Sequence, residues 1–233
     1  MIDSETAAKI KSVTGYAYGD RVNVDKRRAD DGQPTRMGSK KAEAVPLTKA
    51  QRRALKTQPA TPQGRRDQLL MCLLLDHGLR CGEIAALEVS ALQFDHERHT
   101  GFFTFYRPKV SKTQTHTLTP TSYRAARAYF ENDAPAIGKL LRASLKSKDG
   151  DKLGAPGMTD RAITKRVNYL GKKIGIMGLS AHDGRHSAAT ETASKPDVSL
   201  NRMVEMFGWN SPAMALTYIA AARANEGVTF EDD

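Results

Sequence analysis

The chain has 233 residues, of which 39% are hydrophobic and 27% are charged, a composition typical of a protein that buries one sizeable core. Its 36 Lys and Arg residues outnumber 26 Asp and Glu residues and give a formal net charge of +10, which favours a polyanionic partner such as nucleic acid. The longest apolar run, residues 69–75, is far too short to span a bilayer, and residues 1–5 lack the features of a cleavable signal. We therefore expect no membrane partner.

Cysteine usage is sparse. Cys72 and Cys81 are the only two cysteines, and no Cys and His residues have the spacing of a zinc site. The sequence therefore predicts unpaired thiols in a reducing interior and neither a bound metal nor a cofactor.

The two ends of the chain differ in charge. Residues 1–66 hold 15 Lys and Arg against 7 Asp and Glu, whereas residues 223–233 hold one Arg and four acidic residues. A solvated basic arm would give the same imbalance, so charge alone indicates a partner and no activity. Residues 1–45 show little periodic hydrophobicity apart from a short helix expected near residues 5–12. We expect a basic leader or linker over 1–45, a main domain over 46–222 and an acidic tail over 223–233.

The main domain begins with helix signals. A helix is expected over residues 48–56, and a second over residues 61–77. The apolar residues of the second helix occupy most of its circumference, which predicts that it lies buried in the centre of the domain. Gly78 ends this helix, and Arg80 begins a short helix over residues 81–87.

Strand signals follow, and then helices return. The aromatic and β-branched residues of 102–106 and 113–118 predict the strands of a β-hairpin or small sheet, and Pro120 begins a helix that ends near Asn132. Residues 138–157 are predicted to be rich in loops. Further helices are expected over residues 159–174, 181–193, 200–207 and 212–222. The predicted fold class is mainly α with one small antiparallel β-sheet, an α+β arrangement.

Five side chains of the main domain suit the transfer of a phosphodiester. Transfer places extra negative charge on the nonbridging phosphate oxygens, which fixed cations stabilise, and arginine grips two such oxygens at once. Arg80 and Arg185 are the candidates for this clamp. Tyr218 is the candidate nucleophile, and Lys112 is the candidate acid that protonates the departing 5′ oxygen. His182 is the candidate that exchanges a proton near the tyrosine.

A tyrosine nucleophile depends on its neighbours. Its ordinary pKa is about 10, so nearby cations and a base must favour the phenolate as it forms. This requirement explains why Tyr218 would act only within a cluster of cations, and it makes a metal unnecessary. Taken singly, the residues also have structural interpretations, with Arg80 as a helix cap and Tyr218 and Trp209 as packing aromatics.

Four segments that carry these residues resemble motifs of the tyrosine recombinase, or phage integrase, family. Residues 78–87 resemble the box of the first arginine, and Ser111-Lys112-Thr113 resembles the segment of the catalytic lysine. His182-Asp183-Gly184-Arg185-His186 resembles the His-x-x-Arg box. Phe207-Gly208-Trp209, followed nine residues later by Tyr218, resembles the stretch that ends in the nucleophile. The resemblance covers about residues 46–222.

The resemblance implies a tyrosine recombinase catalytic-domain fold and a DNA strand-exchange enzyme that needs neither a metal nor ATP. It implies that Tyr218 forms a 3′-phosphotyrosyl link and that Trp209 belongs to the catalytic set. Supporting roles are implied for Glu83, Asp183 and His186. Double-stranded DNA is the implied partner, with a tetramer on DNA and a monomer when free. A cytoplasmic protein of a prokaryote, phage or mobile element is implied as well.

The sequence departs from the family pattern in three places. Trp209 stands where many members have histidine, and its indole donates one hydrogen bond but cannot titrate. Gly184 replaces the leucine that often precedes the second arginine. The N-terminal core-binding domain of the family is expected to be missing or to survive only as a remnant within residues 1–45.

Alternatives remain open from the sequence. A type IB topoisomerase shares the chemistry, although such enzymes usually carry lysine at the position of His182. A catalytically idle DNA-binding remnant of an integrase would keep the charge without cleavage. Within the hairpin, Lys109 rivals Lys112 as the general acid, and the Ser-Lys-Thr context favours Lys112.

Overall fold

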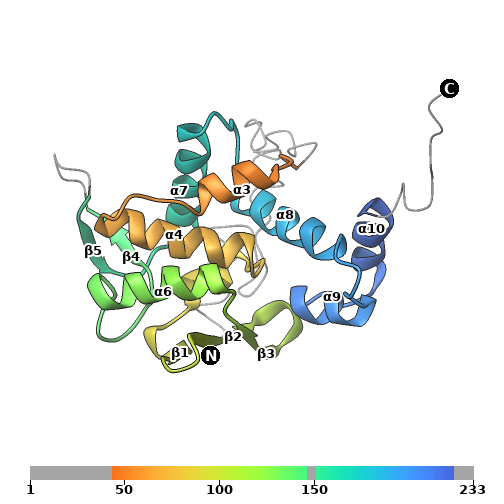
Figure 1. Ribbon diagram of the computed structural model, residues 1–233, viewed down its shortest axis with the longest axis horizontal. Helices are drawn as coiled ribbons and strands as arrows, with labels where there is room; N and C mark the ends of the chain where they lie inside the picture. The colour runs from red at the N-terminus through yellow and green to blue at the C-terminus, as the bar shows by residue number, and fades with distance from the viewer. Residues whose placement is uncertain (1–43, 146–150, 223–233) are drawn as a thin grey trace, which may run out of the picture. The chain divides into compact units, whose positions relative to one another are not determined.

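The computed structural model describes residues 44–145 and 151–222 (Figure 1). The leader expected over 1–45, except for its last two residues, and the tail expected over 223–233 lie outside these ranges. Among the residues described, no helix combines the length and the apolar character needed to cross a bilayer.

A buried helix forms the centre of the fold, as the sequence predicts. This helix, α4, spans Pro62–Leu75, and every residue from Leu69 to Leu75 is fully buried. Thr61 caps its first turn by accepting a hydrogen bond from the Gly64 N–H at 3.2 Å. The seven buried residues in succession leave no solvent-facing side over two turns, which explains the absence of an amphipathic pattern.

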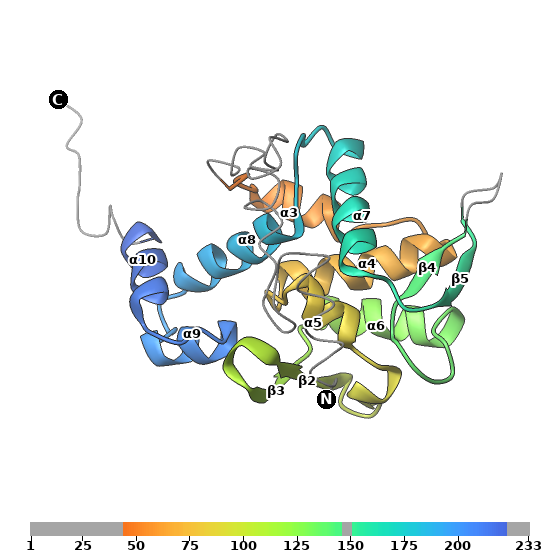
Figure 2. The ribbon, with the colours of Figure 1, turned by 180° about the vertical axis from the view of Figure 1, so that it is seen from behind.

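Two short helices lie on opposite sides of α4. Helix α3 (Lys49–Leu55) faces the viewer in Figure 1, whereas α5 (Cys81–Ala86) faces the viewer in the reverse view of Figure 2. Thr48 and Gln51 form a capping box at the start of α3. The Thr48 hydroxyl accepts from the Gln51 N–H at 3.2 Å, and the Gln51 side chain accepts from the Thr48 N–H at 2.9 Å. Both helices are confirmed where the sequence predicts them.

A three-stranded antiparallel sheet contains the predicted hairpin. Its strand order is β1-β2-β3, and Arg107 of β2 lies opposite Lys112 of β3. The sequence does not predict β1, because four residues are too few to show an alternating pattern. The strands are β1 (Leu92–Asp95), β2 (Thr100–Arg107) and β3 (Lys112–Thr117).

The predicted fold class, mainly α with a small antiparallel sheet, is confirmed, and the structure adds a second antiparallel sheet. Strands β4 (Arg142–Ser144) and β5 (Leu153–Pro156) form inside residues 138–157, which the sequence predicts to be rich in loops. Neither strand has the alternation that marks a strand in sequence. The Arg142 side chain helps to hold the pair, since its Nε donates to the Gly154 carbonyl at 2.8 Å. A long-range side-chain contact therefore supports what local preference does not.

The remaining predicted helices are confirmed to within one residue at each end. The residue before each of the first four is a Thr or Ser whose hydroxyl accepts a hydrogen bond from the first turn. These helices are α6 (Pro120–Asn132), α7 (Asp160–Lys173), α8 (Ala181–Ala193), α9 (Leu200–Phe207) and α10 (Ala213–Ala222).

Two hydrophobic clusters meet at α8. The larger cluster packs α4, α6 and α7 with the inner face of the three-stranded sheet. The smaller cluster joins α8 to α9 and α10, where Met203 and Phe207 pack beside Ala188, Ala189 and Ala215. Because the alanines of α8 leave room, the last two helices pack directly on it, at the right of Figure 1.

Two histidines are packed among aromatic residues between α4 and the sheet. His77 Nε2 lies 3.1 Å from Ser122 Oγ, and its ring packs edge-on against Phe103 at 5.0 Å. His116 packs against Phe103 and Phe105, with ring centroids 5.6 and 5.1 Å apart. Burial lowers the pKa of His77 to about 4 and that of His116 to about 3, with a further contribution to His116 from His77.

The free energy of unfolding should therefore fall as the pH drops below about 6.5. The unfolded chain binds protons at both histidines near that pH, whereas the folded chain binds them only near pH 4 at His77 and pH 3 at His116. Acid thus favours the unfolded state throughout this window. Between pH 6.5 and 4.5 we expect each histidine to account for a loss of about 2 kcal/mol, measured by urea denaturation.

Two substitutions give this prediction a control. His116→Phe should remove about half of the loss in unfolding free energy that the two histidines cause, because phenylalanine cannot be protonated in either state. His96→Phe, at an exposed position outside this aromatic cluster, is the matched control for the change from histidine to phenylalanine. An unaltered pH dependence in the His116 variant would contradict the assignment.

Candidate active site

The first candidate arginine begins α5, just after the turn that ends α4. Gly78 makes this turn with a φ of +61°, and a Cβ there would meet Phe207 Cε1 at 2.4 Å, so only glycine fits. The Arg80 N–H donates to Glu83 Oε2 at 2.8 Å, and Arg80 Nη1 donates to Glu83 Oε1 at 2.7 Å. The same carboxylate therefore caps the helix and orients the guanidinium.

The second candidate arginine reaches the same place from α8. Arg185 is buried, its Nη1 donates to the Gly78 carbonyl, and its Nη2 donates to the Phe207 carbonyl. Arg80 Nη2 donates to the next carbonyl, that of Gly208, at 3.4 Å. Both guanidinium groups therefore meet at the segment that leads from α9 to α10.

A third arginine, which sequence reasoning misses, joins the same network. Arg107 at the end of β2 is fully buried, and its Nη1 donates to both oxygens of Glu83 at 2.9 and 2.8 Å. Its Nη2 donates to the Met206 carbonyl at 2.7 Å, and its Nε donates to the Gln114 side chain. Only its inward-facing place in the alternation of β2 signals burial in the sequence. Arg107 thus ties the hairpin to α5 and α9.

The three arginines that meet here carry more positive charge than Glu83 can balance. Burial, together with the nearby Arg80 and Arg107, lowers the pKa of Arg185 to about 9, and Glu83 opposes this shift. A bound anion would reduce the mutual repulsion of these cations, so the arrangement favours an anionic ligand. Among the described residues, no three His, Cys, Asp or Glu side chains are grouped so as to hold a metal ion.

Tyr218 lies partly buried on α10, and its hydroxyl meets a side chain of α8. Its ring stacks on Trp209 with centroids 5.5 Å apart and an angle of 8° between the planes. Trp209 stacks in turn on Phe207 at 5.0 Å. The hydroxyl lies 2.7 Å from His186 Nδ1. Burial raises the pKa of the Tyr218 phenol, and Arg185 opposes this effect.

The structure brings His186, rather than His182, against the tyrosine. His182 is exposed on the first turn of α8. Burial lowers the pKa of His186, and its neighbour His182 adds to this effect, so the neutral imidazole dominates at neutral pH. In the neutral tautomer that carries its proton on Nε2, Nδ1 accepts a hydrogen bond from the Tyr218 O–H. Sequence reasoning names His186 only as a supporting residue, and its contact with the phenol is direct.

Asp183 fixes the start of α8. Its Oδ2 accepts hydrogen bonds from the N–H and the hydroxyl of Ser180, both at 2.7 Å, and its Oδ1 accepts from the Val45 N–H at 3.0 Å. Gly184 lies in the same capped turn, and a Cβ at Gly184 would meet Leu74 Cβ at 3.4 Å. Gly184, which replaces the leucine that often precedes the second arginine in the family, thus lies where α8 approaches α4 closely.

The two candidate lysines lie at the turn between β2 and β3. Lys112 begins β3 directly opposite Arg107, whereas Lys109 lies in the short 3₁₀ turn η2 (Pro108–Val110). Ser111 closes the turn with a φ of +49°. Both lysines are exposed. Arg107 is held by Glu83, and the backbone of Lys112 pairs directly with that of Arg107 in the sheet. Lys112 is therefore linked to the arginine network more directly than Lys109 is.

Gly208 offers a test of the junction where the arginines meet. Its φ is +54°, and a Cβ would lie 2.5 Å from Arg107 Cδ, so Gly208→Ala combines backbone strain with a clash against a buried side chain. We expect urea denaturation to show a loss of about 2–4 kcal/mol. Gly175→Ala is the matched control, since Gly175 has a φ of +78° and no described atom within 4 Å of the added carbon. It should lose about 1 kcal/mol, and equal losses in both variants would contradict the clash.

Relatives of known sequence share the described domain. The model of the Phage integrase family matches residues 45–225. Tyrosine recombinase XerC of Bifidobacterium longum (strain DJO10A) is 26% identical over 180 residues, which cover 74% of this chain and 48% of XerC. A putative integrase/recombinase, y4gC, of Sinorhizobium fredii (strain NBRC 101917 / NGR234) is 28% identical over 169 residues, which cover 70% of this chain and 80% of y4gC. The chain thus spans about half the length of XerC.

Solved structures share the fold. XerA recombinase matches with a TM-score of 0.59 and 17% identity, over 89% of this chain and 74% of XerA. XerH site-specific recombinase, in a post-cleavage complex with palindromic difH substrate, matches with a TM-score of 0.60 and 17% identity, over 78% of this chain and 52% of XerH. Identities this low establish the fold alone. The family match extends over most of the chain, and the chain therefore belongs to the phage integrase family, that of the tyrosine recombinases.

Proposed function

We propose that this chain is a site-specific DNA recombinase that cuts and rejoins DNA strands through a 3′-phosphotyrosyl intermediate, without a metal or ATP. The observation that carries the proposal is the meeting of two arginines and one tyrosine around residues 207–209. Arg80 and Arg185 donate to carbonyls of this segment, and Tyr218 stacks on its tryptophan. Membership of the family supports the same activity.

The two arginines hold the scissile phosphate in this proposal. The N–H groups of Arg80 and Arg185 that donate to carbonyls are the donors that nonbridging phosphate oxygens require. A guanidinium keeps its proton at neutral pH even where burial lowers the pKa of Arg185 to about 9. The excess positive charge offsets the negative charge that develops on the phosphate oxygens in the transition state.

Tyr218 attacks the phosphorus. A bond forms between the phenol oxygen and phosphorus, and the bond from phosphorus to the 5′ oxygen breaks. His186 accepts the phenol proton, because its Nδ1 lies 2.7 Å from the hydroxyl; His182, one turn earlier, is the alternative base. Lys112, with Lys109 as its alternative, protonates the departing 5′ oxygen. A 5′ hydroxyl from the partner duplex then reverses these steps and restores the phenol.

Double-stranded DNA is the proposed substrate. XerH is described in complex with its difH substrate, and a lambda integrase fragment is described as a dimer bound to a core site. For this chain we propose a tetramer that assembles on two DNA sites and is a monomer when free. The formal net charge of +10 supports a polyanionic partner.

Covalent attachment distinguishes this proposal from a catalytically idle DNA-binding remnant. The probe is a pool of labelled duplexes of random sequence that carry a nick, so that cleavage beside the nick releases a short fragment and traps the protein. The wild-type protein should remain covalently attached to the labelled DNA strand after denaturation. Tyr218→Phe should keep none, because phenylalanine has no oxygen to bond phosphorus.

A matched tyrosine provides the control for attachment. Tyr169→Phe, at a tyrosine 46% exposed on α7, should behave as the wild type does. Salt-sensitive binding by the wild type without attachment would show that the chain only binds DNA. Attachment that survives in Tyr218→Phe would assign the nucleophile elsewhere.

The pH dependence of attachment identifies the base. Burial holds the pKa of His186 below its ordinary value of about 6.5, so the rate should fall only below that pH, where a protonated imidazole no longer accepts the phenol proton. His186→Gln should slow attachment by about 100-fold and remove this pH dependence. If His182→Gln removes it instead, then His182 is the base and His186 orients the phenol.

A further inference from the structure

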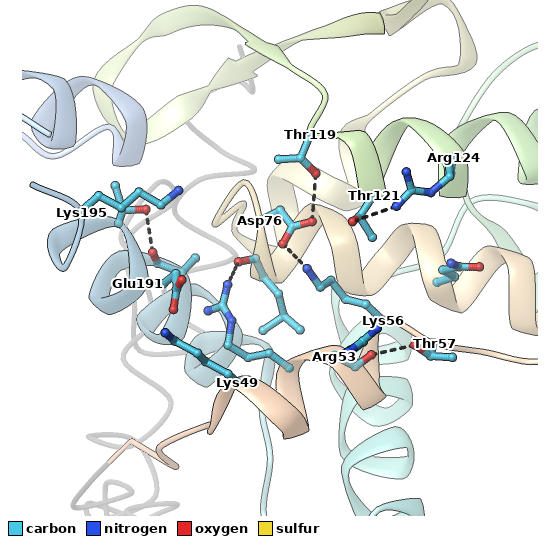
Figure 3. Close-up of a pocket in the computed structure, with 15 residues that line it drawn as sticks. Lys49, Arg53, Lys56, Thr57, Asp76, Thr119, Thr121, Arg124, Glu191 and Lys195 are labelled. Atoms are coloured by element: carbon cyan, nitrogen blue, oxygen red, sulfur yellow. Dashed lines mark hydrogen bonds and ion pairs between the residues drawn. The ribbon is translucent and has the colours of Figure 1, made fainter. Parts of the chain in front are cut away.

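A basic cleft lies among α3, the end of α4, the start of α6 and the C-terminal part of α8. Its volume is about 520 Å³, and Figure 3 shows the side chains that line it. None of the side chains assigned to the candidate active site lines this cleft. Its charged lining consists of the basic residues Lys49, Arg52, Arg53, Lys56, Arg124 and Lys195 and the acidic residues Asp76 and Glu191.

One of the two carboxylates is already neutralised. Asp76 Oδ1 pairs with Lys56 Nζ at 2.6 Å, and Oδ2 accepts from the hydroxyls of Thr119 and Ser122 at 3.2 and 3.1 Å. The buried Arg52 donates at 2.8 Å to the carbonyls of Leu75 and Ser187 and to the Ser187 hydroxyl. These groups form the wall of the cleft, where the Lys56–Asp76 pair is neutral and Arg52 keeps its positive charge.

Four exposed basic side chains of the lining have no ion-pair partner within the described part of the chain, and Glu191 is the one acidic side chain of the lining that could offset their charge. Lys49, Arg53, Arg124 and Lys195 are exposed, and none of them forms an ion pair with another described residue. In Figure 3 Lys195 lies at one end of the cleft and Arg124 at the other, with Lys49 and Arg53 along the lower edge. The cations are therefore spread along the cleft instead of converging on one point.

The cleft and the candidate active site each include one of the two short helices that lie on opposite sides of α4. Helix α3, which supplies the lower edge of the cleft, faces the viewer in Figure 1. Helix α5, which begins after Arg80, faces the viewer in Figure 2. Arg80, Arg107 and Arg185 do not line the cleft, so a phosphate bound by the cations of the cleft would be a different phosphate from the one held by Arg80.

We propose that this cleft binds the sugar–phosphate backbone of a nucleic acid segment other than the one held at the active site. This proposal rests on the proposed function only in assuming that the active site holds a DNA segment. It does not require the chain to cleave DNA. Cations spread along a cleft match the repeated phosphates of a strand. The lining also contains the hydroxyl of Thr121, and hydroxyl groups are ordinary partners of phosphate and sugar oxygens.

An acidic peptide matches the cleft less well. The lining has two apolar side chains, Leu75 and Ala188. Peptide and protein partners are usually anchored by apolar or aromatic side chains that fill a pocket, and this lining supplies no such pocket. Charge alone would have to hold a protein partner here.

Site-specific photocrosslinking tests whether DNA enters the cleft. A benzophenone side chain in place of the exposed cleft residue Thr57 should crosslink to a labelled duplex of random sequence. The same group in place of Ile137, which is 83% exposed and lies outside the cleft, provides the background. Unlabelled duplex should compete for the crosslink, and polyglutamate of equal charge should not. Effective competition by polyglutamate alone would overturn the proposal in favour of an acidic protein.

Two pairs of charge substitutions show whether the named cations are responsible. Arg53→Gln with Lys195→Gln should lower the Thr57 crosslink by roughly tenfold, because two phosphate contacts are lost. Arg98→Gln with Lys139→Gln removes the same charge outside the cleft and should lower it less than about twofold, since salt screens distant charges. Equal effects of the two pairs, or a Thr57 crosslink no stronger than background, would overturn the proposal.

Attachment to nicked duplexes separates this inference from the proposed function. Both charge variants should still become attached through Tyr218, because none of the four residues belongs to the candidate active site. A wild type that crosslinks at Thr57 but never becomes attached would contradict the proposed function and leave the cleft assignment standing. Attachment of the wild type without a Thr57 crosslink would contradict the cleft assignment and leave the proposed function standing.

Discussion

The candidate active site depends on one buried ion pair, that between Glu83 and Arg107. Both side chains are almost completely removed from water, where an unpaired charge is strongly destabilising. The donors of Arg107 are satisfied by three different elements: the carboxylate on α5, a side chain of β3 and a carbonyl at the end of α9. Because separating any of these elements would leave a buried charge without its partners, the hairpin and the helices keep one mutual arrangement.

This arrangement concentrates positive charge where neutral oxygens are the acceptors. Arg80 reaches a carbonyl that lies 128 residues further along the chain, and Arg185 donates to two carbonyls as well. An acceptor with a full negative charge interacts more strongly with both guanidinium groups than a carbonyl does. Since residues 75 and 76 line the basic cleft and residues 78–80 begin the active site, the end of α4 contributes to both cationic surfaces.

Much of the fold is readable in the sequence because its signals are local. The hydroxyl groups of Thr48, Thr61 and Ser180 each cap a helix by accepting a hydrogen bond from the first turn, within three residues of the cap. The run of buried leucines predicts the central helix, and short motifs place Arg80 and Tyr218 in the candidate site. Strands β4 and β5 carry no such signal and depend on tertiary contacts.

The sequence by itself determined the helices, the family motifs and the chemical types of the site residues, because these depend on neighbours a few positions apart. Only the tertiary structure decided which side chains meet. In the sequence Arg107 is an ordinary arginine of a hairpin, and its importance comes from burial beside Glu83. The choice of His186 over His182 as the contact of Tyr218 depends on how α10 packs on the alanines of α8. Burial and helix packing join residues far apart in the chain, and no local pattern records which of these residues meet.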